Sequence, residues 1–355
     1  MKAWTVVVPL AAAVMLAVAW WWGATGAILV ACVVALIGAV IAAVHHAEVV
    51  AHRLGEPFGT LVLALAVTVI EAALVLSMML AGGENSAAVA RDTIYSAVMI
   101  ICNGVVGICL LAGGLRHGEQ AFRVEGTGSG LAALAALSTL VLVAPTLTTS
   151  APSGAYTRSQ LGFVAVASLV LWLVFVFIQT IRHRDYFLPV DSAADESAHA
   201  EPPTLRATVA STMLLLLALV VVVGLAKMLS PTIEQGVRAA GAPMAVVGVL
   251  IAMIVLLPET WAAFRAARAN RLQTSMNLAI GSAMASIGLT IPVVVVASIA
   301  FRLPLQIGLL PNEIALLALT FIVGSITLGS GRTNLMQGAI HLVVFAAYLF
   351  LTLVP

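Results

Sequence analysis

The sequence predicts an all-α integral membrane protein with eleven transmembrane helices. The chain has 355 residues, of which 62% are hydrophobic and only 9% are charged, whereas a soluble domain carries about 25% charged residues. The mean hydropathy is +1.13. The apolar runs are long and show no strand-like alternation, so the predicted spans are helices rather than the strands of a barrel.

About 20 apolar residues cross a bilayer, and this rule places each helix in turn. The first run ends at the aromatic residues 20–22, which are typical of a membrane interface, and it is too long for a signal peptide. We therefore interpret it as a retained span. The eleven predicted helices cover residues 3–22, 24–44, 59–81, 93–113, 129–149, 160–181, 207–229, 243–264, 274–299, 312–329 and 333–354.

The distribution of Lys and Arg predicts which side each loop faces, because cytoplasmic loops are enriched in both residues. With the N-terminus inside, only five of the 16 basic residues fall in outer segments. We therefore predict a cytoplasmic N-terminus and, after eleven spans, a C-terminus on the opposite side. A compact chain without a long targeting extension is typical of a multi-pass protein of the bacterial inner membrane, so we expect the C-terminus in the periplasm. The five outer residues are Arg91, Arg158, Lys227, Arg238 and Arg302.

The longest polar connection, residues 182–206, is interpreted as a solvated cytoplasmic linker between two halves of the chain. An alternative is a regulatory segment that senses cations at the cytoplasmic face. Its acidic residues include Asp191, Asp195, Glu196 and Glu201.

Composition and motifs exclude several other classes of protein. The net charge of +1 gives no reason to expect a nucleic-acid partner, and phosphate loops and hydrolase or zinc-protease motifs are absent from the sequence. Cys32, Cys102 and Cys109 all lie in apolar runs, so we predict small buried side chains rather than a disulfide framework or a zinc site.

Two glutamates lie inside predicted spans, where a charge costs about 2.5–3.5 kcal/mol on insertion scales. Glu71 lies in GTLVLALAVTVIEAALVLSMML (59–80), and Glu259 lies in MIVLLPETWAAF (253–264). Each is followed by a helix with polar and small residues, including Asn103 in one copy and Ser282 in the other. The copies are an odd number of helices apart, which indicates an inverted repeat built around a site at the membrane midplane.

The chain therefore divides into an extra N-terminal helix (1–22), a first five-helix repeat (23–181), the linker (182–206) and a second five-helix repeat (207–355). At 1.5 Å per residue, Glu71 and Asn103 lie roughly 16 Å from their hairpin turn, and Glu259 and Ser282 lie roughly 13–16 Å from theirs. Half of the hydrocarbon core is about 15 Å. We therefore predict that both carboxylates reach the middle of the membrane.

Two prolines are predicted to break the helices of the second repeat. Pro258 directly precedes Glu259, and Pro292 lies in the following helix near Gly288 and Thr290. Proline removes a backbone donor and leaves carbonyls unpaired, and such carbonyls can bind cations in broken membrane helices. The alternative interpretation is an ordinary kink.

The stretches GEPFGTLVLALAVTVIEAALVLSMML (55–80) and LLPETWAAFRAARANRLQTSMNLAIGSAMASIGLTIPVVV (256–295) resemble the two alpha-repeats of the calcium/cation antiporter superfamily. The chain is most similar to its bacterial calcium–sodium/proton antiporter branch, the ChaA type. The resemblance implies that Glu71 and Glu259 are the exchanging carboxylates, with Asn103 and Ser282 as polar neighbours. Thr68 and Leu256 stand where the wider superfamily often has asparagine.

Carboxylates suit proton-coupled cation transport because they bind both hard cations and protons. We predict alternating access in which only a cation-loaded or protonated site crosses between the two sides. The predicted partners are Ca²⁺, Na⁺ or K⁺, protons and the lipid bilayer, with no resident cofactor and no predicted oligomeric state. Ca²⁺ takes 6–8 oxygen ligands, so other groups must complete the shell. The candidates, each of which has helix–helix hydrogen bonding as an alternative role, are Thr68, Asn103, Asn277, Ser282 and Ser286.

The sequence is also compatible with other functions. The same carboxylates would serve a symporter or a cation channel. An intramembrane enzyme would use Glu71, Glu259 and His341 as acid–base or metal-binding residues, although the sequence offers no nucleophile or dense ligand motif. A membrane scaffold leaves the two glutamates unexplained, and His341 has the alternative role of a buried, hydrogen-bonded histidine.

A short histidine-containing segment raises one further alternative. The spacing of His45, Glu48 and His52 places them on one helical face. This pattern fits either a metal site or the solvated inner end of the second helix, where histidine could respond to pH.

Overall fold

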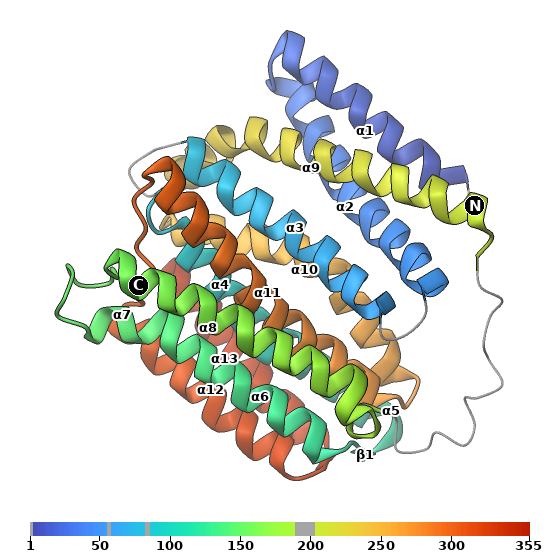
Figure 1. The fold of residues 1–355 in the computed structure, drawn as a ribbon, viewed down its shortest axis with the longest axis vertical. Helices are drawn as coiled ribbons and strands as arrows, with labels where there is room; N and C mark the ends of the chain where they lie inside the picture. The colour runs from blue at the N-terminus through green and yellow to red at the C-terminus, as the bar shows by residue number, and fades with distance from the viewer. Residues whose placement is uncertain (1–2, 55–57, 82–85, 189–202) are drawn as a thin grey trace.

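The computed structural model describes residues 3–54, 58–81, 86–188 and 203–355, and these residues are almost entirely helical (Figure 1). The α-helices are α1 (Ala3–Trp22), α2 (Gly26–Leu54), α3 (Phe58–Ala81), α4 (Val89–Met99), α5 (Val106–His117), α6 (Val124–Ser138), α7 (Ala144–Leu147), α8 (Arg158–Phe177), α9 (Leu205–Ala239), α10 (Ala245–Arg268), α11 (Leu272–Phe301), α12 (Pro311–Gly329) and α13 (Leu335–Leu353).

Three π-helical segments and one 3-10 turn join or extend these helices. They are η1 (Ile100–Val105), η2 (Thr139–Val143), η3 (Ile178–Arg182) and the 3-10 turn η4 (Arg184–Phe187). Two short strands, β1 (Gln120–Ala121) and β2 (Arg332–Thr333), pair antiparallel. They tie the α5–α6 connection to the α12–α13 connection.

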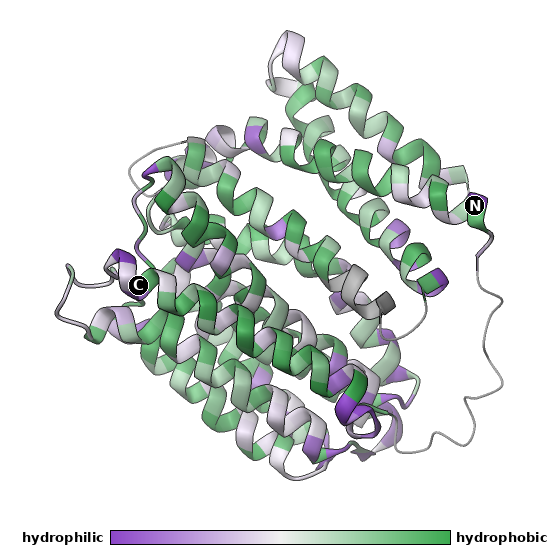
Figure 2. Cartoon of the chain, viewed as in Figure 1, coloured by the Kyte–Doolittle hydropathy of each residue, from purple (hydrophilic) through white to green (hydrophobic). Residues whose placement is uncertain are grey.

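The helices have the length and polarity of membrane spans. Ten helices among the described residues are long and apolar enough to cross a bilayer, and α3 adds the apolar stretch Leu65–Leu80. In Figure 2 hydrophobic residues dominate the helical bodies, whereas hydrophilic residues gather toward helix ends and connections. The prediction of an eleven-helix membrane protein is confirmed.

Two helices are about ten residues longer than predicted at their C-terminal ends. The second helix runs to Leu54 rather than to residue 44, and α9 runs to Ala239 rather than to residue 229. The rule used for prediction counts only residues that suit lipid, whereas a helix continues into the polar interface wherever packing supports it. Here α2 packs along α9, and α1 packs against both of them.

The two halves of the chain pack on each other reciprocally. One set consists of α2, α3, α4–α5, α6–α7 and α8, and the other consists of α9 to α13. Where a helix of one set contacts a helix at a different position of the other set, the two helices at the swapped positions also contact each other. Thus α3 packs on α11 while α4 packs on α10, and α8 packs on α11 while α13 packs on α5. The first members, α2 and α9, contact each other, as do the fourth members, α6 and α12. An inverted repeat produces this pattern.

The predicted helix breaks at Pro258 and Pro292 are wrong. Both prolines lie inside the uninterrupted helices α10 and α11. Proline removes only one hydrogen bond of the ladder, and the neighbouring turns keep theirs. In α10 the Thr260 hydroxyl also donates to the carbonyl of Leu256 at 2.7 Å, which adds a bond beside the proline.

The acidic residues Asp191, Asp195, Glu196 and Glu201 lie outside the described residues. The three cysteines are free and buried, as predicted.

Candidate ion-binding site

Glu71 lies on α3 in the interior of the bundle, with 2% of its surface exposed. Its Oε2 accepts a hydrogen bond of 2.8 Å from the Ser286 hydroxyl on α11. Its Oε1 is buried and has no hydrogen-bond partner among the described residues. A buried carboxylate oxygen without a donor is costly, so this oxygen is suited to accept a proton or to bind a cation.

Glu259 lies on α10 and is half-buried. Its Oε2 accepts a hydrogen bond from the Ser282 hydroxyl. Ser282, which the resemblance implies as a polar neighbour, therefore contacts Glu259 directly, and Ser286, a candidate supporting ligand, contacts Glu71. The charges of the two glutamates also act on each other, so the helices α3 and α10 bring both carboxylates into one region.

One face of α11 carries the hydroxyls that hold both glutamates. Ser282 and Ser286 are four residues apart, and side chains at this spacing are neighbours on a helix, with about 5–6 Å between their Cβ atoms. Thr290 continues the row by one more turn, and its hydroxyl is buried with no partner among the described residues. Thr68 is buried one turn before Glu71 on α3.

The two candidate asparagines make their hydrogen bonds elsewhere. Asn103, in η1, donates to the Thr320 hydroxyl at 2.8 Å and has its Oδ1 3.3 Å from Nδ1 of His341. Asn277 donates to the carbonyl of Phe187 at 2.6 Å and accepts from Gln273 at 2.8 Å. Within the described part of the chain, no hydrogen bond joins either asparagine to a glutamate.

His341 belongs to a second buried polar cluster between η1, α12 and α13. Its Nε2 lies 3.1 Å from the Thr327 hydroxyl, opposite the contact of its Nδ1 with Asn103. The interpretation of His341 as a buried, hydrogen-bonded histidine therefore fits the structure. Sequence analysis missed Thr320 and Thr327, although both are hydroxyl residues inside an apolar span, which is the pattern that also marks Ser282 and Ser286.

The segment of His45, Glu48 and His52 lies inside α2, and within the described ranges no group of three His, Cys, Asp or Glu residues is arranged to hold a metal ion. The ring of His45 packs against Trp4, with centroids 5.3 Å apart. Packing against Trp4 of α1 therefore accounts for the position of His45 without a metal ion.

The chemistry available to the two-glutamate region follows from its oxygen atoms. Two carboxylates can supply up to four oxygens, and the hydroxyls of Ser282 and Ser286 lie against them. This set suits a hard cation such as Ca²⁺ or Na⁺. When no cation is bound, two negative charges in a dry interior favour the uptake of protons. One region can therefore hold either a cation or protons.

Comparisons with known proteins agree with this chemistry. Residues 24–181 and 210–354 match the family model described as sodium/calcium exchanger protein. The putative ionic transporter y4hA of Sinorhizobium fredii is 49% identical over 90% of this chain and 87% of its own length. The sodium-potassium/proton antiporter ChaA of Escherichia coli is 35% identical over 89% of this chain and 86% of its own length.

A solved structure shows the same fold. The Ca²⁺/H⁺ antiporter protein YfkE superposes with a TM-score of 0.74 at 15% sequence identity, covering 100% of both chains. The matched family consists of secondary cation exchangers, which are transporters, so the alternative of an intramembrane enzyme is set aside. The chain belongs to the sodium/calcium exchanger protein family.

Proposed function

We propose that this antiporter exports Ca²⁺ from the cytoplasm in exchange for H⁺, with Na⁺ and K⁺ as competing substrates. Glu71 and Glu259 bind the cation or the protons in turn. The observation that carries the proposal is the Oε1 atom of Glu71, which is buried without a donor beside a second carboxylate. A bound ion or proton satisfies this oxygen, and no described side chain does so.

The charge of the site favours a divalent cation or two monovalent ones. Two ionised glutamates carry two negative charges, which one Ca²⁺ or two protons neutralise. Ser282 and Ser286 are proposed as supporting ligands, and Thr68 lies near enough in sequence to join them. Asn103 and Asn277 are weaker candidates for cation ligands, because their side chains hydrogen-bond to other groups. The relative named as a sodium-potassium/proton antiporter supports testing monovalent ions beside Ca²⁺.

The proposed setting is the bacterial inner membrane, with the N-terminus in the cytoplasm and the C-terminus in the periplasm. The excess of Lys and Arg in alternate connections supports this orientation. We also propose the division into an extra helix (1–22), two five-helix repeats (23–181 and 207–355) and a linker (182–206). The reciprocal packing of the two sets of helices supports it.

Everted membrane vesicles test the proposal. Respiration first acidifies the vesicle lumen, and Ca²⁺, Na⁺ or K⁺ is then added while a fluorescent dye reports the lumenal pH. The wild type is expected to dissipate the gradient, whereas Glu71→Gln and Glu259→Gln are expected not to. Glu125→Gln is the matched control, because Glu125 is an exposed glutamate at the start of α6.

Three outcomes contradict the proposal. Equal dissipation by the wild type and both glutamate variants removes these carboxylates from the mechanism. Cation flux through the wild type without any movement of protons indicates a channel, and cation and proton movement in the same direction indicates a symporter.

A further inference from the structure

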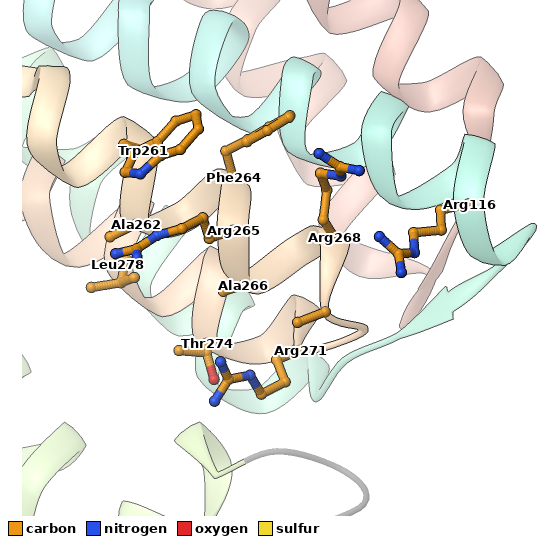
Figure 3. A pocket seen from close by; sticks show the side chains of 11 residues that line it. Arg116, Trp261, Ala262, Phe264, Arg265, Ala266, Arg268, Arg271, Thr274 and Leu278 are labelled. Atoms are coloured by element: carbon orange, nitrogen blue, oxygen red, sulfur yellow. The ribbon is translucent and has the colours of Figure 1, made fainter.

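A large pocket lies where α10 turns into α11, at the end of the molecule that the proposed orientation places in the cytoplasm. Its volume is about 720 Å³, within the range of small-molecule binding sites. Figure 3 shows the arginines and aromatic side chains that surround it. The lining residues are Arg116, Trp261, Ala262, Phe264, Arg265, Ala266, Arg268, Ala269, Arg271, Thr274 and Leu278.

Four arginines from two parts of the chain give this pocket a strong positive charge. Arg116 comes from the end of α5, Arg265 and Arg268 come from the end of α10, and Arg271 directly precedes α11. Among the described residues, no acidic side chain forms an ion pair with Arg116, Arg265 or Arg268. Glu48 of α2 is near enough for its charge to act on Arg265. The remaining positive charge favours an anionic ligand.

The aromatic residues of the pocket are placed for contact with lipid. Trp261 is 58% exposed, and its ring stacks on Phe264, with centroids 5.8 Å apart and planes inclined by 27°. The guanidinium of Arg268 lies over the ring of Phe264 at 5.8 Å. Trp261 lies seven residues before Arg268, the last residue of α10, which is roughly 10 Å at 1.5 Å per residue. Its exposed ring is therefore placed beside the acyl chains, while Arg268 lies at the level of the headgroups.

The pocket is held in shape by contacts between the two halves of the chain. Gln120 of β1 donates to the carbonyl of Ala267 at 3.0 Å and to the side chain of Asn270 at 2.9 Å. Asn270 has a φ of 59°, a left-handed conformation that asparagine tolerates better than most residues. The turn that carries the arginines is thus fixed by the neighbouring strand.

We propose that this basic aromatic pocket binds the headgroup of an anionic phospholipid of the inner leaflet, and that it prefers a lipid with two phosphates such as cardiolipin. Arginine matches phosphate oxygens with paired N–H groups, and basic pockets between membrane helices on the cytoplasmic side bind headgroups of this kind. Several arginines around one pocket suit two phosphates better than one. The acyl chains remain in the bilayer beside Trp261.

The pocket adjoins the proposed transport site without being part of it. Ala262 lies three residues after Glu259, and Leu278 lies four residues before Ser282, so each is one helical turn away. A bound lipid phosphate neutralises arginines that otherwise repel a cation approaching Glu259. The inference rests on the proposed orientation, but lipid binding itself does not require that the chain exchange ions.

Native mass spectrometry of the full-length protein in detergent tests the inference. The purified, delipidated protein is mixed with equal amounts of cardiolipin and phosphatidylcholine, and the lipid retained on the protein is measured. We expect the wild type to retain cardiolipin preferentially. We expect the double variant Arg265→Gln with Arg268→Gln to have a roughly tenfold or more lower affinity for cardiolipin. Each arginine near an anionic surface raises the affinity by a factor of about five to ten.

Three controls make the result interpretable. Arg158→Gln with Arg302→Gln removes the same charge at the opposite end of the helices and is expected to leave cardiolipin binding unchanged. Arg265→Lys with Arg268→Lys keeps the charge and is expected to retain most of the binding. Excess pyrophosphate, a soluble diphosphate without acyl chains, is expected not to displace the lipid from the wild type.

Each contrary outcome overturns the inference. Equal retention of cardiolipin by the Gln variant of the pocket and by the wild type removes these arginines from lipid binding. Equal retention of phosphatidylcholine and cardiolipin by the wild type shows no anionic preference, and this comparison needs no variant. Displacement by pyrophosphate identifies a site for a free phosphate compound instead. All three readouts are independent of the transport assay, so their failure is distinguishable from failure of the proposed antiport.

Discussion

The hydroxyl of Ser286 on α11 donates a 2.8 Å hydrogen bond to Oε2 of Glu71 on α3. This bond joins the third helix of the second repeat to the second helix of the first repeat. It also fixes which carboxylate oxygen is occupied, because the other oxygen of Glu71 has no partner among the described residues. Under the proposed function, the hydroxyl occupies one oxygen of Glu71 and leaves the other for the bound ion or proton.

Removing this hydroxyl is expected to weaken cation binding. A hydrogen bond to a charged group is worth about 1.5–3 kcal/mol, and 1.4 kcal/mol is a factor of ten. We expect Ser286→Ala to raise the cation concentration for half-maximal exchange about tenfold or more, while Ser286→Thr restores most of the loss. Dose–response curves in everted vesicles measure this value. Ser325→Ala, at an exposed serine on α12, is the control, and an unchanged curve for Ser286→Ala contradicts the role.

Binding of Ca²⁺ is expected to stabilise the folded protein through the two glutamates. At a concentration about a hundredfold above the dissociation constant, a ligand that binds only the folded state stabilises it by about 2.7 kcal/mol. We expect Ca²⁺ to raise the melting temperature of the detergent-purified wild type and of Glu125→Gln by several degrees. Glu71→Gln is expected to fold but to show no such shift. A full Ca²⁺ shift in this variant places the cation elsewhere.

Two glycines on α11 provide a matched test of close helix packing. A Cβ atom added at Gly288 lies 2.5 Å from Cβ of Trp172 on α8, whereas one added at Gly281 meets nothing within 4 Å. Overpacking a core costs about 1–3 kcal/mol, so we expect Gly288→Ala to lower the melting temperature and Gly281→Ala to leave it unchanged or raise it slightly. Thermal unfolding monitored by fluorescence measures both. Equal melting temperatures of the two variants would mean that α8 moves aside without a loss of folding stability.

The cluster around His341 is expected to serve stability rather than ion exchange. His341→Ala removes the partner of the Asn103 Oδ1 and of the Thr327 hydroxyl, while Asn103 keeps its bond to Thr320. Each unsatisfied group costs about 1–3 kcal/mol. We expect a lower melting temperature but retained antiport per folded molecule, measured by thermal unfolding and by the vesicle assay. His52→Ala, at an exposed histidine of α2, should change neither. Loss of antiport with an unchanged melting temperature would assign His341 to proton transfer.

The number of spans and the pairing of the glutamates could be predicted because both depend on local sequence. Apolar length alone marks a span, and the spacing from Glu71 or Glu259 to its turn fixes its depth. Spacing within α11 also places Ser282 and Ser286 on one face. These features need no knowledge of which helices are neighbours.

The direction in which Asn103 points could not be predicted in this way. Its depth matches that of Glu71, but its facing depends on the rotation of the helix about its axis, which packing against α12 and α13 decides. Asn103 also lies in the π-helical segment η1, where one extra residue per turn shifts the face of every following side chain. Composition gives no signal for such a segment. The extensions of α2 and α9 depend likewise on contacts between distant parts of the chain.

The reciprocal packing of the two repeats has a consequence for the transport cycle. The helix of Glu71, α3, packs on α11, and the helix of Glu259, α10, packs on α4. Each glutamate helix is therefore seated on a helix of the opposite repeat. A rigid displacement of one repeat against the other shifts both contacts together, so the surroundings of the two carboxylates change in step.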